Sequence, residues 1–163
     1  MNRRWMLKII ILALTVLQCL FIFSMSAAPA DVSQDMSGSI TYRVADLIVR
    51  NLEHMDAAAR QQMIEQIDHF IRKTAHFTEY ALLGGLLMLD MNIVLEKASA
   101  AFAGLAWMLG TLFAASDEWH QTFVEGRSGQ VTDVILDSLG VAAGVLIVCI
   151  IARTANRRKV SHG

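Results

Sequence analysis

The chain has 163 residues, of which 55% are hydrophobic, and its formal net charge is −1 at pH 7. Its mean hydropathy of +0.45 is high for a soluble domain of this size, and long apolar runs recur along it. A helix needs roughly 20 apolar residues to cross a bilayer core of about 30 Å. The composition therefore excludes an ordinary soluble protein and indicates an all-α, polytopic membrane protein surrounded by lipid. We expect one domain over residues 1–163 and no nucleic-acid partner.

The first apolar run, at about 9–26, follows three basic residues, Arg3, Arg4 and Lys8. This basic flank predicts a cytoplasmic N-terminus, because positive charges stay on the cytoplasmic side of a membrane. A cleaved signal peptide is the alternative, since the small residues at 26–30 are typical of a cleavage region. The apolar run is long for a signal peptide, which favours a retained helix. In both cases the next segment emerges on the outer side.

Residues 31–70 form an outer segment that is too polar and charged to cross a membrane. Its first part, 31–39, contains Gly38 and predicts a loop. Apolar residues then recur at helical spacing, and Asp56 is placed to cap a second helical stretch. We therefore expect one or two amphipathic helices, which either lie on the outer membrane interface or cover the bundle by packing against it.

The second span is predicted at about 74–92, and polar residues cluster at its start. Arg72, His76 and Glu79 are spaced at i, i+4 and i+7, so they share one face of a helix. Because charges in a spanning helix are costly, such side chains face the bundle interior or the interface and have partners. A neighbouring face carries two more polar residues that are seven apart, Lys73 and Tyr80.

A short turn at 93–97 leads into the third span, at about 98–116, and the fourth span follows at about 131–152. Glycines in both spans predict close contacts between helices, because they let two backbones approach each other. These glycines are Gly104 and Gly110 in the third span, and Gly140 and Gly144 in the fourth.

The two ends of the chain predict the same topology. Four basic residues follow the last span and place the C-terminus in the cytoplasm, namely Arg153, Arg157, Arg158 and Lys159. A cytoplasmic N-terminus and an even number of spans require the same placement. With four spans, the start of the second, the end of the third and the start of the fourth all lie at the outer face.

The polar stretch 117–129 separates the third span from the fourth. If the third helix continues past Ser116, Glu118 and Gln121 point together, since they are three residues apart. Gly126 and Gly129 then allow the chain to turn back, because glycine tolerates tight backbone conformations.

Three interpretations of the polar residues at the outer face remain open. In the first, cations and carboxylates only pair and tie the helices together. In the second, a carboxylate or histidine acts as general base while Lys73 and Arg127 hold a phosphate or carboxylate. In the third, the same groups bind a ligand without chemistry. The candidate catalytic residues are His76, Glu79, Asp117, Glu118 and Asp133, and the candidate binding residues are Arg72, Lys73, Tyr80, Gln121, Arg127 and Asp137.

The sequence points to no particular cofactor. It contains neither a His-Glu-x-x-His motif nor a paired Cys-x-x-Cys motif, so we predict no metal site. It also contains no Gly-rich phosphate loop. Among ion pairs, we expect Glu79 or Asp133 to face Arg72 or Arg127. Breaking such a buried pair costs on the order of 3–5 kcal/mol.

Two polar motifs carry a resemblance to a known family. The first reads Arg72-Lys73-Thr74-Ala75-His76-Phe77-Thr78-Glu79-Tyr80, and the second reads Asp117-Glu118-Trp119-His120-Gln121-Thr122-Phe123 and continues through Arg127 to Asp133 and Asp137. In order and spacing they resemble the two signatures of VanZ-like membrane proteins, and the resemblance covers most of residues 5–152. The family pattern often has proline where this chain has Glu125, a departure that affects the rigidity of the loop.

The resemblance implies a protein of the bacterial cytoplasmic membrane, which agrees with the multi-pass topology and the cytoplasmic termini that the residues predict. The named member of the family is associated with low-level resistance to the glycopeptide antibiotic teicoplanin. We therefore expect a polar site at the outer face that binds a glycopeptide or a cell-wall precursor, such as a lipid-linked cell-envelope intermediate. The alternative is an intramembrane hydrolase or transferase that acts on a phosphorylated or lipid-linked intermediate.

Overall fold

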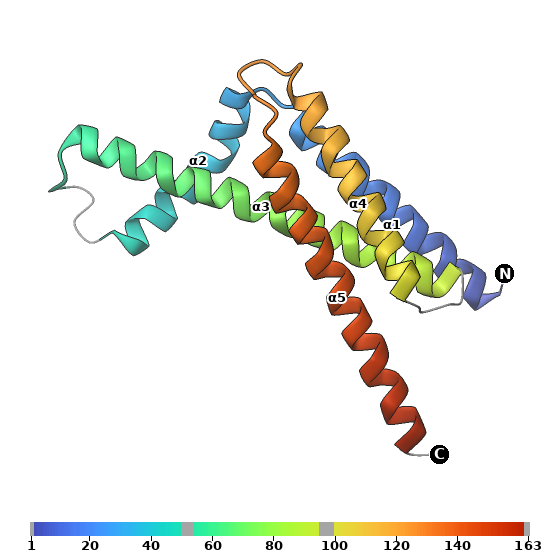
Figure 1. The fold of residues 1–163 in the computed structure, drawn as a ribbon. Coiled ribbons are helices and arrows are strands. Elements are labelled where there is room, and N and C mark those ends of the chain that lie inside the picture. Colours follow the sequence, from blue (N-terminus) through green and yellow to red (C-terminus); the bar gives the residue numbers. More distant parts are fainter. Residues whose placement is uncertain (1, 50–53, 95–99, 162–163) are drawn as a thin grey trace.

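The computed structural model describes residues 2–49, 54–94 and 100–161, and within these ranges it has five helices and no strand. The helices are α1 (Arg3–Ser26), α2 (Ala30–Ile48), α3 (Ala57–Val94), α4 (Ala100–Gln121) and α5 (Val131–Ser161) (Figure 1). The prediction of an all-α protein is therefore confirmed. Most of the turn predicted at 93–97 lies outside the described residues.

Three of these helices are long and apolar enough to cross a membrane: α1, α4 and the part of α5 up to Ala155. Their outer faces expose large side chains such as Leu17 (59% exposed), Leu112 (59%) and Ile151 (60%). Soluble monomers rarely expose apolar surface of this extent, whereas helices in contact with lipid typically do. The chain is thus a membrane protein. The second predicted span, 74–92, lies within α3, which is not among the three, so the number of four spans stays a prediction.

Helix α3 contains 38 residues and is therefore about 57 Å long, at roughly 1.5 Å per residue. Two stretches that the sequence predicted separately, an amphipathic helix over about 56–71 and a span over 74–92, form this single helix. The reason is local, because no glycine or proline occurs between Ala57 and Leu83 to end the helix.

The prediction of a loop at 31–39 is wrong, since these residues form the first half of α2. Pro29 stands at the start of the helix, where its fixed φ and missing N–H are tolerated. Gly38 lies inside the helix and costs only about 1 kcal/mol relative to alanine. Packing on α3 offsets this cost, because Ala45 of α2 and Ile64 of α3 form a small apolar core of their own.

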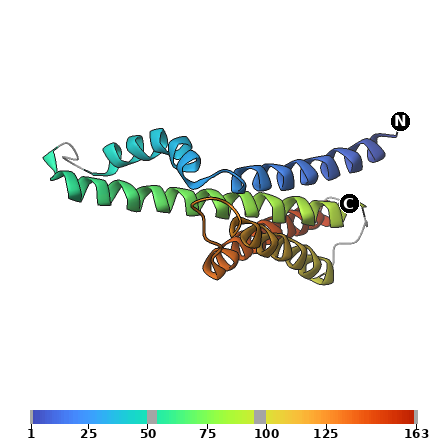
Figure 2. The ribbon, with the colours of Figure 1, turned by 90° about the horizontal axis from the view of Figure 1, so that it is seen from above.

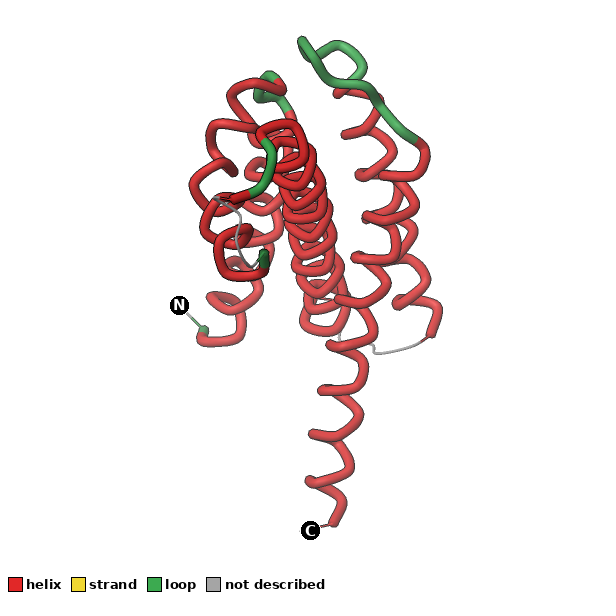
Figure 3. The backbone as a smooth tube through the Cα atoms, turned by 90° about the vertical axis from the view of Figure 1, so that its left-hand side faces the viewer, coloured by secondary structure: helices red, strands yellow, loops and turns green. Residues whose placement is uncertain are grey.

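Helix α3 lies between two pairs of helices. Figures 2 and 3 show α1 and α2 along one side of it and α4 and α5 along the other. The C-terminal half of α3 packs with α1, α4 and α5, whereas its N-terminal half projects beyond the bundle together with α2 (Figure 1). The outer segment of the sequence is therefore a two-helix layer built on an extension of the bundle.

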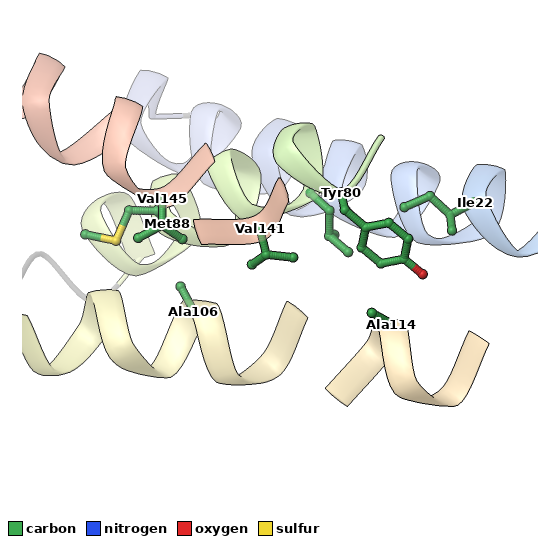
Figure 4. Packing of buried hydrophobic residues seen from close by; sticks show 8 residues of the cluster. Ile22, Tyr80, Met88, Ala106, Ala114, Val141 and Val145 are labelled. Atoms are coloured by element: carbon green, nitrogen blue, oxygen red, sulfur yellow. The ribbon is translucent and has the colours of Figure 1, made fainter. Parts of the chain in front are cut away.

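The core of the bundle lies where α3, α4 and α5 meet. It contains Tyr80, Leu83 and Met88 of α3, and Val141 and Val145 of α5, each at most 4% exposed (Figure 4). Helices α1 and α4 add three smaller contributions, from Ile22, Ala106 and Ala114. These residues fix α3 against its neighbours and thereby position the polar residues at its centre.

Glycines set the distance between α3 and α5. A Cβ atom on Gly84 or Gly144 would collide with a backbone carbonyl of the opposite helix, that of Val141 or Ala81 respectively. The predicted role of Gly140 and Gly144 in close helix contact is confirmed, and so is that of Gly110, which packs on Val141. The same prediction for Gly104 is wrong, because no atom of the described residues lies within 4 Å of the position of its Cβ.

Candidate functional site

A cavity of about 480 Å³ opens between α2, α3 and the α4–α5 loop, which comprises residues 122–130. Seven of the predicted site residues line it, namely Arg72, Lys73, His76, Glu79, Gln121, Arg127 and Asp133. The shared face predicted from the spacing of Arg72, His76 and Glu79 is thus confirmed. The rest of the wall includes apolar residues of α1, α2 and α3, such as Met25, Met36 and Ile71.

The α4–α5 loop carries Arg127 into this cavity. Gly126 has a φ of +72°, a left-handed conformation that favours glycine and confirms the predicted turn. Arg127 then reaches across to two neighbouring helices. Its Nη1 donates to Gln121 Oε1 of α4 at 3.3 Å, and its Nη2 donates to the carbonyl oxygen of Met25 in α1 at 3.2 Å.

Both of these acceptors are uncharged. Within the described part of the chain Arg127 forms no ion pair, although its side chain is half-buried. Burial lowers the pKa of its guanidinium, and the charge of Arg72 lowers that pKa further, while the carboxylates of Asp117 and Glu118 act in the opposite direction and by less. The group remains protonated, because arginine in proteins does not lose its proton. Arg127 is consequently a cation in a recess, close to a second cation and held by neutral partners.

The other two cations of the cavity have carboxylate partners. Lys73 Nζ pairs with Asp133 of α5, and Arg72 Nε lies 3.0 Å from Asp68 Oδ2, one turn earlier in α3. The expectation that Glu79 or Asp133 pairs with Arg72 or Arg127 is therefore wrong. The pairing depends on how α3 and α5 lie against each other, which the spacing of residues within one helix does not specify.

Asp117 lies behind the cavity and is 2% exposed. Its Oδ2 accepts hydrogen bonds from Ser26 Oγ at 2.6 Å and from Tyr80 Oη at 3.2 Å, so it links α4 to α1 and α3. Gln121 Nε2 is 3.4 Å from the same oxygen and donates to Glu118 Oε1 at 3.1 Å. The predicted convergence of Glu118 and Gln121 is confirmed by this contact.

Glu118 also holds the start of α5. Its Oε2 accepts from the backbone N–H of Gln130 at 2.9 Å, just before the helix begins at Val131. A carboxylate in this place satisfies a free N–H and lies at the positive end of the helix dipole. Gly129 makes this contact possible, because a side chain there would collide with the carbonyl of Glu118. These contacts join the two ends of the second motif, and the contacts of Tyr80 with Asp117 and of Lys73 with Asp133 join it to the first.

Four ionisable groups in this region have buried polar atoms without a hydrogen-bond partner among the described residues, namely Arg72 Nε, His76 Nδ1, Asp117 Oδ1 and both carboxylate oxygens of Asp137. Asp137 of α5 is 1% exposed, and neither carboxylate oxygen has a partner. His76 lines the cavity, and its Nδ1 has none. In the described ranges no three His, Cys, Asp or Glu side chains gather closely enough to hold a metal ion.

The predicted residues thus occupy two zones, a cavity wall and a buried zone behind it. Tyr80, Asp117, Glu118 and Asp137 form the buried zone and do not line the cavity. Sequence reasoning missed two residues that matter for the geometry, Ser26 and Asp68. The position of Asp68, four before Arg72 on the same helical face, could have revealed it. No comparable signal marks Ser26.

We expect α1 to remain attached to the mature protein. Ile22 and Ser26 are fully buried, and α1 supplies acceptor and donor groups to Arg127 and Asp117, so cleavage within 26–30 would open the core and the site. The intact mass of protein purified from membranes by a C-terminal tag should be that of the uncleaved chain. A product shortened by the first helix would contradict this expectation and support the signal-peptide alternative.

The fold and the site together define a helical membrane protein whose bundle holds a buried polar centre beside an amphipathic cavity. The sequence profile of the VanZ/LLP1 family matches residues 9–152, and the chain belongs to this family. The match includes both polar motifs and confirms the resemblance that they carry. No curated protein and no solved structure matches the chain.

Proposed function

We propose that this VanZ-like protein resides in the bacterial cytoplasmic membrane with four spans, and that its cavity faces the outer side. Basic residues near both ends of the chain favour cytoplasmic termini. Figure 1 supports this arrangement, because both termini lie toward one end of the bundle and the α4–α5 loop lies toward the other. The layer of α2 and the N-terminal half of α3 then projects beyond the outer end of the bundle, next to the cavity.

The cavity, in this proposal, binds the anionic group of a cell-envelope ligand. Arg127 is the observation that carries the proposal, since it is a half-buried cation without an ion pair among the described residues, and it lines a cavity beside Arg72. Two guanidinium groups in one recess repel each other, and a phosphate or carboxylate between them removes that repulsion. Arginine also offers paired N–H donors that match such oxyanions.

Ligands of this kind include a glycopeptide such as teicoplanin and a lipid-linked intermediate of the cell envelope. Both present anionic groups at the outer surface of the membrane, where we place the cavity. Binding of the drug would keep it from its target, whereas binding of a lipid-linked intermediate would affect envelope assembly. The membrane location and family of the chain suit either ligand.

The test compares wild type with Arg127→Ala at matched membrane levels. A charge-assisted hydrogen-bonded contact contributes about 1.5–3 kcal/mol, so we expect the variant to bind a polyprenyl phosphate or teicoplanin at least tenfold more weakly. Any protection of a teicoplanin-sensitive Gram-positive host should be lost as well. Binding is measured on purified protein in detergent, and the susceptibility of the host is measured in parallel.

The matched control is Arg60→Ala, which removes an exposed arginine of α3 that does not line the cavity. This variant should behave as wild type in both assays. Equal binding by wild type and Arg127→Ala would refute the proposed site. Release of phosphate or of a cleaved product during these assays would instead identify a hydrolase or transferase.

A further inference from the structure

We infer that the ligand of the cavity is a phosphate-bearing lipid, with its phosphate at Arg127 and an acyl chain along α2. This inference rests on the proposed function and narrows its ligand to one chemical class.

The cavity wall has two chemically different sides. The side formed by α3 and the α4–α5 loop carries the three cations Arg72, Lys73 and Arg127. The side formed by α2 and the end of α1 is largely apolar, with Met25, Met36 and Ile40. A small anion such as free phosphate would contact only the basic side. An amphiphile would contact both.

On the basic side of the cavity, two of the three cations have a carboxylate partner and the third forms no ion pair in the described ranges. Lys73 and Arg72 pair with Asp133 and Asp68, so Arg127 is the cavity cation that forms no ion pair among the described residues. Asp117 and Glu118 attract it only without direct contact. Glu79 also lines the cavity, but it is seven residues from Arg72 and thus lies about 10 Å further along α3. The outer part of the cavity, near Arg127 and Arg72, is where a phosphate fits.

The apolar side continues onto the open surface of α2. Val32, Met36 and Ile40 are each four residues apart and form one stripe on the helix, and they are 44%, 52% and 55% exposed. Met36 and Ile40 belong to this stripe and to the cavity wall at once. An acyl chain can therefore leave the cavity along α2 without crossing a polar barrier.

Asp68 holds α2 in the orientation that this path needs. Its Oδ1 accepts from Ser37 Oγ at 2.6 Å and from Thr41 Oγ1 at 2.9 Å, and its Oδ2 pairs with Arg72. Ser37 and Thr41 each follow a residue of the stripe directly in sequence. The hydrogen bonds of these two side chains to Asp68 therefore hold the stripe beside the cavity. The same carboxylate also orients Arg72, one of the cations of the cavity.

The experiment uses two probes that share a phosphate group, dioleoyl phosphatidate in detergent micelles and water-soluble glycerol 3-phosphate. The full-length protein should bind the lipid at least tenfold more tightly. Replacing the apolar wall, Met36→Gln with Ile40→Gln, should weaken lipid binding about tenfold and leave glycerol 3-phosphate binding unchanged. Met36→Leu with Ile40→Leu keeps the wall apolar and should retain lipid binding. Leu47→Gln, at a highly exposed position of α2 outside the cavity, is the matched control and should bind both probes as wild type does.

The two proposals fail in different ways. If wild type binds both probes equally, or if the glutamine variant keeps full lipid binding, the acyl-chain path is refuted. Sensitivity of glycerol 3-phosphate binding to Arg127→Ala would still support the anion site in that case. If Arg127→Ala changes the binding of neither probe, the proposed function fails, and the lipid assignment fails with it.

Discussion

Replacing Gly144 with alanine should destabilise the protein more than any other single methyl group added to the bundle. The new Cβ would run into the carbonyl oxygen of Ala81 and would lie 2.7 Å from the backbone nitrogen of Gly85. Backbone atoms cannot rotate out of the way as side chains do, so α3 and α5 would have to separate. Overpacking of a tight contact costs about 1–3 kcal/mol or more, and we expect the upper end of that range.

The matched control for this substitution is Gly104→Ala in α4. Within the described part of the chain nothing lies within 4 Å of its Cβ position, and alanine favours the helix by about 1 kcal/mol over glycine. Thermal melting of the two variants in the same detergent should show a clear loss for Gly144→Ala and no loss for Gly104→Ala. Wild-type melting of Gly144→Ala would mean that α3 and α5 do not approach as closely as the structure indicates.

Asp117→Ala is the second substitution with a large expected effect. It would leave the hydroxyl groups of Ser26 and Tyr80, both fully buried, without the acceptor that joins α1, α3 and α4. Each buried donor left without an acceptor costs about 1–3 kcal/mol, so the variant should lose roughly 3 kcal/mol of folding free energy. Its melting temperature in detergent should fall accordingly.

Asp137→Asn is the informative contrast to Asp117→Ala. Asp137 is equally buried, but its carboxylate accepts no hydrogen bond from the described residues, so the folded state gains no such contact to offset the cost of burying it. Replacing it with a neutral side chain of the same shape should leave the melting temperature unchanged or raise it. If Asp137→Asn destabilised the protein more than Asp117→Ala, the assignment of structural roles to these two carboxylates would be reversed.

Much of the fold could be predicted from local patterns. Apolar runs located α1, α4 and α5, and the i, i+4, i+7 spacing placed Arg72, His76 and Glu79 on one face of α3. The loop predicted at 31–39 shows where local patterns fail. Its serines, aspartates and glycine have low helix propensity, and α2 is stabilised by contacts with Asp68 and Ile64, about 30 and 20 residues away in sequence.

The sequence could predict which polar residues gather in this region. It could not predict which of them form hydrogen bonds or ion pairs with each other. The polar motifs named side chains that gather at the cavity wall and in the buried zone behind it, because charged residues in apolar surroundings require partners. The partners of those charges depend on the crossing of α3 and α5, which glycines such as Gly144 determine. For this reason Asp133 could be expected to form an ion pair, while its choice of Lys73 over Arg127 could not.

The polar character of α3 has a consequence for biogenesis. Helices α1, α4 and α5 are apolar enough to leave the translocon for lipid one at a time, whereas α3 is not. In the four-span arrangement, α3 makes its most extensive contacts with α5, which the ribosome makes last. Stable insertion of α3 would then wait for α5, and the two helices would enter the lipid as a pair. Nascent chains that stop before α5 would leave Lys73 of α3 without its carboxylate partner Asp133 and become substrates for membrane quality control.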